Sequence, residues 1–269
     1  MSFYTSLNGI SNAQTELDTI SNNLANAETT GFKSSRVNFA DIVAGSAYAN
    51  PKVVEGIGAM VKTVDQNFST GAMTTTGSAL DVAVNGEGFL TVKSPISGYS
   101  LYTRNGNFST DSAGYITDQN ANRVQILAYS GGTFATTPSD GQLPTANAAG
   151  SAYAGVQIAT DGTIKASYAD GSITTIGKIA LASFVAPTGL LQIGDQDWQA
   201  TGLSGGATYN APDAGGMGSV LSGSLEQSNV NVSSELVNMI SAQQYFQANS
   251  KAISTNNTMI TAIMNAVSG

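Results

Sequence analysis

The chain contains no cysteine and no histidine. These absences exclude disulfides, thiol nucleophiles and catalysis by Ser-His-Asp or Cys-His groups, and they remove the usual ligands of zinc. Charged residues are also scarce, at 10% of the chain against about 25% in an average domain. The net charge of −8 argues against a nucleic-acid partner and an anionic membrane surface, because both require clustered Lys and Arg.

Long apolar runs are also missing from the sequence. No stretch of about 18 apolar residues occurs, so we expect no transmembrane helix and no direct membrane insertion. The start, MSFYTSLNGISNAQ, lacks a basic segment followed by an apolar one, so no cleaved signal peptide is expected. Apolar residues nevertheless make up 41% of the 269 residues, enough to bury a core.

Both ends of the chain carry apolar residues at seven-residue intervals. These are Phe3, Ile10, Leu17 and Leu24 at one end, and Val232, Met239, Phe246, Ile253, Ile260 and Val267 at the other. This spacing predicts two long helices with narrow, coiled-coil-like stripes. The second helix should run for about 35 residues, with Ser233 or Ser234 as N-cap and Glu235 in its first turn.

The partners of these two stripes can be interpreted in two ways. The helices either pair within one chain against the central domain, or are completed by neighbouring copies of the same protein. The second interpretation is favoured, because helices this long usually belong to coiled coils or arrays. The apolar residues of the two stripes are therefore the predicted polymerisation interface.

The first helix is expected to stop sharply. Thr29-Thr30-Gly31 interrupts the stripe after Leu24, and glycine tolerates the positive φ found at helix C-termini, so Gly31 is predicted to end the helix. Phe32 is expected to anchor the connector that follows.

The middle of the chain has the patterns of β-structure. Residues 79–94 predict a hairpin with a turn at Asn85-Gly86, and residues 102–118 predict turns near Asn105-Gly106 and at 112–114. Residues 155–185 predict strands separated at Asp161-Gly162 and Asp170-Gly171. Short strands spaced about 8–12 residues apart are typical of a sandwich or barrel.

These patterns predict an α+β protein whose long terminal helices pair as a coiled-coil-like layer beside a central all-β domain. Residues 1–30 plus 229–269 would form the terminal helical polymerisation domain. Residues 31–70 would be a connector, and residues 71–228 the β domain. Within it, residues 131–154 are rich in Gly, Pro and Ala and predict a short loop.

Candidates for chemistry are weak. The GIGAMV stretch at 56–61 lacks the third glycine and the βαβ pattern of a dinucleotide site. Asp195 and Asp197 beside Trp198 resemble a sugar- or calcium-binding group, but a solvated turn beside a core tryptophan explains them better. We expect no catalytic, cofactor-binding or metal site, and hence no enzyme.

Two terminal motifs carry a family resemblance. SNNLANAETTGFK (21–33) resembles the N-terminal signature of bacterial flagellar rod and hook axial proteins, and SGSLEQSNVNVSSELVNMISAQQYFQANSKAIST (222–255) is similar to their C-terminal signature. The signature residues are Asn22, Asn23, Leu24, Ala25, Asn26, Gly31, Phe32 and Lys33, with Ser228, Asn229 and Val230. TTTGSALDVAVNGEGFLTV and YTRNGNFSTDSAGYITD resemble the β-domain entry of the same family.

Within the family, three stretches are most similar to the hook protein: the start MSFYTSLNGI, FADIVAGS (39–46) with its fairly short connection to 65–77, and residues 168–205. The resemblance implies a hook subunit. Such subunits would assemble into a curved, flexible tube that transmits torque from the rod to the filament. A distal rod subunit is the alternative, which the chain length and the short loop 131–154 fit, because hook proteins usually carry an outer domain there. A secreted carbohydrate-binding module is a third hypothesis.

The resemblance also implies partners and a location. The subunit would form a homopolymer with its terminal helices in the inner tube, next to the distal rod protein, the hook cap and the hook–filament junction proteins. It would be exported by the flagellar type III apparatus without a cleaved signal and end up extracellular, in the flagellum.

Overall fold

The computed structural model describes residues 3–43 and 56–268. The chain divides into two compact units. Unit 1 combines Met1–Ala27, Ser34–Asn67 and Val230–Gly269, and unit 2 combines Glu28–Lys33 with Phe68–Asn229. Residues 1–2, 44–55 and 269 lie outside the described residues, and with them the middle of the predicted connector, the end of FADIVAGS and both extremes of the predicted helical domain.

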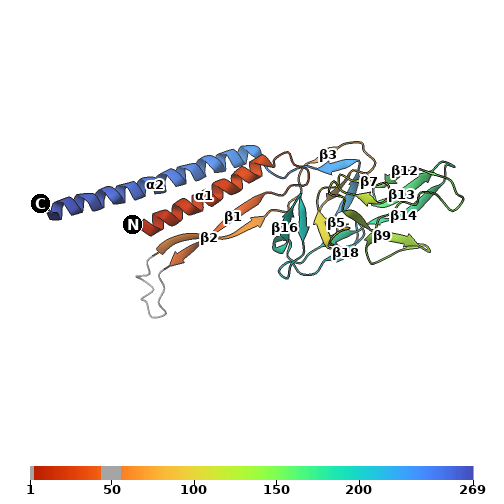
Figure 1. The fold of residues 1–269 in the computed structure, drawn as a ribbon, viewed down its shortest axis with the longest axis horizontal. Helices are drawn as coiled ribbons and strands as arrows, with labels where there is room; N and C mark the ends of the chain where they lie inside the picture. Colours follow the sequence, from red (N-terminus) through yellow and green to blue (C-terminus); the bar gives the residue numbers. More distant parts are fainter. Residues whose placement is uncertain (1–2, 44–55, 269) are drawn as a thin grey trace. The chain divides into compact units, whose positions relative to one another are not determined.

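The described residues of unit 1 form two helices and a two-stranded hairpin (Figure 1). The helices are α1 (Phe3–Ala25) and α2 (Val232–Ser268), which confirms the two long terminal helices and the α+β class. Strands β1 (Ser35–Val43) and β2 (Gly56–Gln66) pair antiparallel and pack along α1. The sequence patterns did not predict this hairpin, whose strands lie in the stretch expected to be a connector.

The two helices run antiparallel, in one register along their shared length. Asn23 of α1 reaches Glu235 of α2, and Gly9 lies against Asn249, where an added Cβ would come within 2.6 Å of the amide oxygen. If this register continues, Phe3 lies level with Thr255. The last turns of α2 therefore project past the described part of α1 (Figure 1).

Two predicted helix ends are wrong. α1 ends at Ala25, six residues before Gly31, although Gly31 does have a positive φ of 72°. The N-cap of α2 is Asn231 rather than Ser233 or Ser234, because its Oδ1 accepts the Ser234 N–H at 3.0 Å. Glu235 does lie in the first turn, as predicted.

Unit 2 is built from short antiparallel strands and one short 3-10 helix. They are β3 (Met73–Thr75), β4 (Val82–Asn85), β5 (Phe89–Lys93), β6 (Ser100–Thr103), β7 (Ser109–Thr110), β8 (Ile116–Thr117), β9 (Arg123–Ser130), β10 (Thr133–Phe134), β11 (Ser139–Asp140), β12 (Tyr153–Ile158), β13 (Thr163–Tyr168), β14 (Ile173–Ile179), β15 (Leu181–Ser183), η1 (Pro187–Gly189), β16 (Leu191–Gly194), β17 (Asp197–Gln199), β18 (Thr208–Asn210), β19 (Ser219–Ser222) and β20 (Ser224–Glu226). The main path of the large sheet runs β12-β13-β14-β9-β5-β6-β17-β16, while β4 pairs with β19 and β3 with β20.

The predicted hairpins have mixed outcomes. The turns at 112–114, at Asp161-Gly162 and at Asp170-Gly171 are confirmed, since β7 pairs with β8 and β12, β13 and β14 pair in succession. The hairpin at Asn85-Gly86 is wrong, because β4 pairs with β19 and β5 pairs with β6, β9 and β15. The expected loop 131–154 contains β10 and β11, which both pair with β9.

Two apolar clusters form the core of unit 2. The larger includes Val82, Leu90 and Ile164, which have no exposed surface. The smaller collects Phe89, Tyr102 and Trp198, which pack edge to face with Phe68 and Phe184. No helix in the described ranges combines the length and apolar character needed to cross a membrane.

Candidate assembly surface

The predicted apolar stripe of α1 is only partly covered. Phe3 is 45% exposed, and Ile10, Leu17 and Leu24 are partly buried. The buried positions of this helix are Ser6, Ala13 and Ile20, on a neighbouring seven-residue row, and Asn23, three residues after Ile20. The stripe therefore lies beside the seam that α1 buries within its own chain.

The stripe of α2 becomes more exposed along the helix. Met239, Phe246 and Ile253 are partly buried, whereas Ile260 is 55% and Val267 83% exposed. Val232, at the other end, is 43% exposed. This trend follows the antiparallel register, because the later positions lie beyond the described part of α1.

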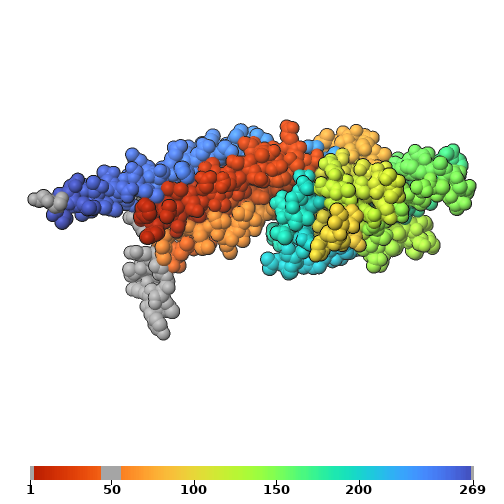
Figure 2. Space-filling view, viewed as in Figure 1, coloured from red at the N-terminus to blue at the C-terminus, as the bar shows by residue number. Residues whose placement is uncertain are grey.

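The last turns of α2 carry further apolar side chains in the open. Met259, Ile263 and Met264 are each more than half exposed. On the face shown in Figure 2, no other described part of the chain covers these turns. Exposed apolar surface of this kind is typical of interaction sites. The residues of both stripes remain the predicted interface.

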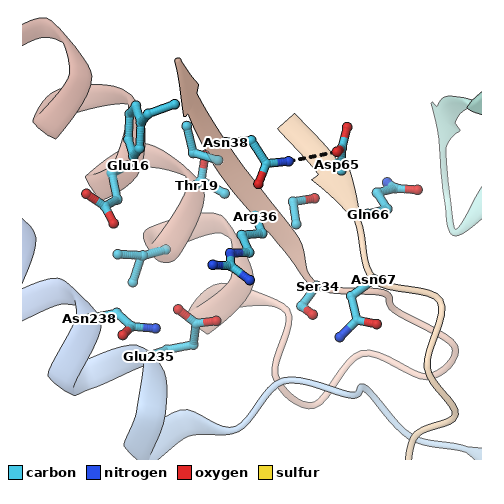
Figure 3. Close-up of a pocket in the computed structure, with 14 residues that line it drawn as sticks. Glu16, Thr19, Ser34, Arg36, Asn38, Asp65, Gln66, Asn67, Glu235 and Asn238 are labelled. Carbon is cyan, nitrogen blue, oxygen red and sulfur yellow. Dashed lines mark hydrogen bonds between the residues drawn. The ribbon is translucent and has the colours of Figure 1, made fainter. Parts of the chain in front are cut away.

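A cleft of about 790 Å³ opens within unit 1 between the helices and the hairpin (Figure 3). Glu16 of α1, Arg36 of β1 and Asn238 of α2 line it, and Asn38 donates to Asp65 at 2.7 Å on one wall. Burial raises the pKa of Glu16 above its ordinary value. Carboxylate, guanidinium and amide groups therefore line the cleft.

The signature asparagines of α1 have different environments. Asn23 is buried and joins three elements: its Nδ2 donates to Ser35 O at 2.8 Å and to Glu235 Oε1 at 3.2 Å, and its Oδ1 accepts the Ser35 N–H at 2.9 Å. Asn22 and Ala25 are exposed, and Leu24 is partly buried. The Asn26 side chain donates to the Asn22 carbonyl at 2.9 Å. Asn23 thus has an internal structural role.

The second half of the same signature lies in unit 2 and is buried. The Gly31 N–H donates to the Glu226 carbonyl at 2.7 Å, and Phe32 is 6% exposed. Lys33 Nζ lies 2.6 Å from Glu226 Oε1 and 2.8 Å from Ser69 O, with no exposed side-chain surface. Burial lowers the pKa of Lys33, and the Glu226 carboxylate opposes that shift.

The C-terminal signature meets this cluster. Asn229 Nδ2 donates to Ser69 O at 3.1 Å and to Ser69 Oγ at 3.2 Å, while Ser228 is buried and Val230 begins the return to unit 1. Glu226 also accepts from Arg104 Nη1 at 3.3 Å and from the Gly71 N–H at 2.8 Å. The sequence patterns singled out neither Glu226 nor Arg104, although both fall inside motifs that carry the resemblance.

The solvated turn predicted at Asp195–Asp197 is confirmed only in part, because Asp195 is exposed whereas Asp197 is buried. Asp195 and Gln196 have φ values of 53° and 60°, and Trp198 is 1% exposed in the smaller core cluster. Burial, together with the Asp118 carboxylate, raises the pKa of Asp197 to about 7. Among the residues that the structure describes, no group of three or more acidic side chains could hold a metal ion.

Comparisons with known proteins cover most of the chain. Residues 3–33 match the family model "Flagella basal body rod protein", residues 83–166 the "Flagellar hook protein FlgE/F/G D1 domain", and residues 221–266 the "Flagellar basal body rod FlgEFG protein C-terminal".

The "Flagellar basal-body rod protein FlgG" of Bacillus subtilis is 35% identical over 98% of both chains. The protein of the same name from Caulobacter vibrioides is 35% identical over 96% of both. The "Flagellar hook protein FlgE" of Escherichia coli is 26% identical over 98% of this chain and all of its own length.

Proposed function

Because the chain belongs to the family of flagellar basal-body rod and hook proteins, we propose that it is a structural subunit of the distal rod. The family is structural and not enzymatic. The observation that carries the proposal is the end-to-end match to FlgG rod proteins, which covers 98% of both chains in the Bacillus subtilis case.

The rod interpretation is better supported than the hook interpretation that the sequence first suggested. The alignment to the Escherichia coli hook protein runs over 408 positions, against 269 residues in this chain, at 26% identity. The hook protein therefore contains segments with no counterpart here. The short local similarities at the N-terminus and at 168–205 are outweighed by this difference along the whole chain.

Assembly would proceed through the two terminal stripes. The partial exposure of Phe3, Phe246 and Ile253 and the open last turns of α2 support a surface that neighbouring copies complete. Flagellar axial proteins form polymeric rod and hook assemblies, so a homopolymer with coiled-coil-like packing of α1 and α2 against their neighbours fits the family. The buried aromatic cluster of unit 2 gives no support to a carbohydrate-binding face.

Partners and location follow from the same proposal. The subunit would be exported by the flagellar type III apparatus and would lie outside the cytoplasm, in the basal body, next to other axial proteins. Under the hook alternative, its neighbours would instead include the distal rod protein, the hook cap and the hook–filament junction proteins.

Electron microscopy of assemblies formed by the purified full-length chain tests the proposal. Straight, short tubes are the expected result. Curved tubes would favour the hook alternative, and a protein that stays monomeric at every concentration and salt condition would contradict both.

A further inference from the structure

The segment Glu28–Lys33 has an unusual position along the chain. Its six residues belong to unit 2, although the residues before and after it belong to unit 1. The chain passes between the units again after Asn67 and after Asn229. Because so short a segment has little surface to bury, a few specific contacts must hold it in unit 2.

Backbone hydrogen bonds give part of that attachment. The Gly31 N–H donates to the Glu226 carbonyl at 2.7 Å, and the Asn229 N–H donates to the Phe32 carbonyl at 3.4 Å. At Gly31, a Cβ would lie 2.7 Å from the Asn105 nitrogen. The segment is therefore fitted closely between the end of β20 at Glu226 and the backbone at Asn105.

The Lys33 side chain links the places where the chain crosses between the units after Lys33, Asn67 and Asn229. Its Nζ reaches Glu226 Oε1 at 2.6 Å and Ser69 O at 2.8 Å, and Asn229 Nδ2 donates to the same Ser69 carbonyl at 3.1 Å. Lys33, Ser69 and Asn229 each lie within two residues of a point where the chain passes between units. One network, buried at Lys33 and Glu226 and exposed at Ser69, thus joins three of the places where the chain passes between the units.

The charges in this network are not balanced one to one. Glu226 faces two buried cations, Lys33 and Arg104, and Arg104 also donates to the Val84 and Gly86 carbonyls. Burying such an ion pair costs much of what its attraction returns, so it adds little to global stability compared with apolar residues of similar volume. Its strict geometric demands favour one arrangement of the surrounding chain instead.

We propose that the buried Lys33–Glu226 pair is a latch that fixes the points at which the chain enters and leaves unit 2. The latch holds segment 28–33 and the adjoining residues of unit 2 in one conformation. The stability of the strand core does not depend on the latch. This role goes beyond the proposed rod function, because it concerns the single subunit before assembly.

Amide hydrogen exchange of the full-length monomer tests the latch. Lys33→Met removes the charge and both Nζ contacts but keeps an unbranched chain in the buried site, and Glu226 retains Arg104 and the Gly71 N–H. We expect exchange at least tenfold faster at Gly31 and Asn229, with β5 and β9 amides unchanged. The matched control is Lys178→Met, which removes the more exposed pair with Asp161 and should change neither amide.

Two outcomes would overturn the latch. One is exchange at Gly31 and Asn229 within twofold of the wild type in Lys33→Met. The other is equal acceleration throughout unit 2, which would mean that Lys33 merely stabilises the whole fold. If Lys33→Met does not fold, Lys33→Gln is measured by the same criteria, since it also removes the charge but leaves a polar amide in the buried site.

Discussion

Asp197 should make the stability of unit 2 depend on pH in an unusual direction. This residue is 4% exposed, and its pKa is raised from 3.8 to about 7, mainly by burial and further by the Asp118 carboxylate. Below about pH 4 the carboxyl group is neutral in both the folded and the unfolded chain. Between about pH 4 and 7 only the unfolded chain ionises it, so the free energy of unfolding falls as pH rises.

The size of the effect follows from the shift. Each pKa unit corresponds to about 1.36 kcal/mol, so this carboxylate lowers the free energy of unfolding by about 4 kcal/mol at pH 8 relative to pH 4. Asp197→Asn keeps the shape and an acceptor for the Asn122 amide, whose Nδ2 lies 3.4 Å from Asp197 Oδ2, and it removes the buried charge. The variant should match the wild type near pH 4 and be about 4 kcal/mol more stable at pH 8.

Urea unfolding between pH 4 and 8 measures this difference, with fluorescence of the single tryptophan, Trp198, as the reporter of unit 2. Asp195→Asn is the control, because it removes a neighbouring carboxylate that contributes less to the shift than burial does. Its gain at pH 8 should be well below that of Asp197→Asn. A difference between Asp197→Asn and the wild type that stays constant with pH would refute the reasoning.

Two further predictions concern the signature residues. Asn23→Ala should lower the free energy of unfolding of unit 1 by about 1–3 kcal/mol in urea titrations followed by helical circular dichroism, because it removes the hydrogen bonds of a buried amide to the partly buried backbone of Ser35. The exposed Asn22→Ala should change the same free energy by less than about 0.5 kcal/mol. Gly31→Ala should lower the free energy of unfolding, measured by Trp198 fluorescence, by at least about 1 kcal/mol more than Gly77→Ala does. Both glycines have a positive φ, but of the two only Gly31 has backbone atoms within 4 Å of the added Cβ. Equal losses of stability in the two variants would contradict this close fit.

Local patterns in the sequence were sufficient to predict those elements whose stabilising contacts lie between residues close together in the chain. The long helices follow from seven-residue spacing, and the hairpins at Asp161-Gly162 and Asp170-Gly171 follow from turn chemistry. In these turns each aspartate accepts a backbone N–H two residues later, from Thr163 at 3.1 Å and from Ser172 at 2.9 Å. Such contacts require no knowledge of the rest of the chain.

Contacts between distant segments could not be predicted in the same way. The pairing of β4 with β19 joins residues 82–85 to 219–222, so the Asn85-Gly86 signal predicted a hairpin that the fold does not form. The network of Lys33, Glu226 and Arg104 likewise brings together three separate stretches. The sequence alone does not show that these charged residues are buried, because charged side chains are usually exposed.

Apolar periodicity predicted the helices better than it predicted which of their residues are buried. Apolar periodicity selected Phe3, Ile10 and Leu17, while the most buried positions of α1 include Ser6 and Asn23. Those two lie where α1 is enclosed by its own chain, and small or hydrogen-bonded polar residues suit such close contacts. Hydrophobic patterns therefore locate the open stripe better than the internal contact.

The central claim, assembly through the terminal stripes, is tested most directly by electron microscopy of full-length variants. Met239→Asp and Ile253→Asp each place a carboxylate on the stripe of α2, and Gln244→Asp adds the same charge at an exposed position off the stripe. We predict tubes from the wild type and Gln244→Asp, and only monomers with native Trp198 fluorescence from the two stripe variants. Normal tubes from Met239→Asp and Ile253→Asp, or equal loss with Gln244→Asp, would contradict the proposed interface.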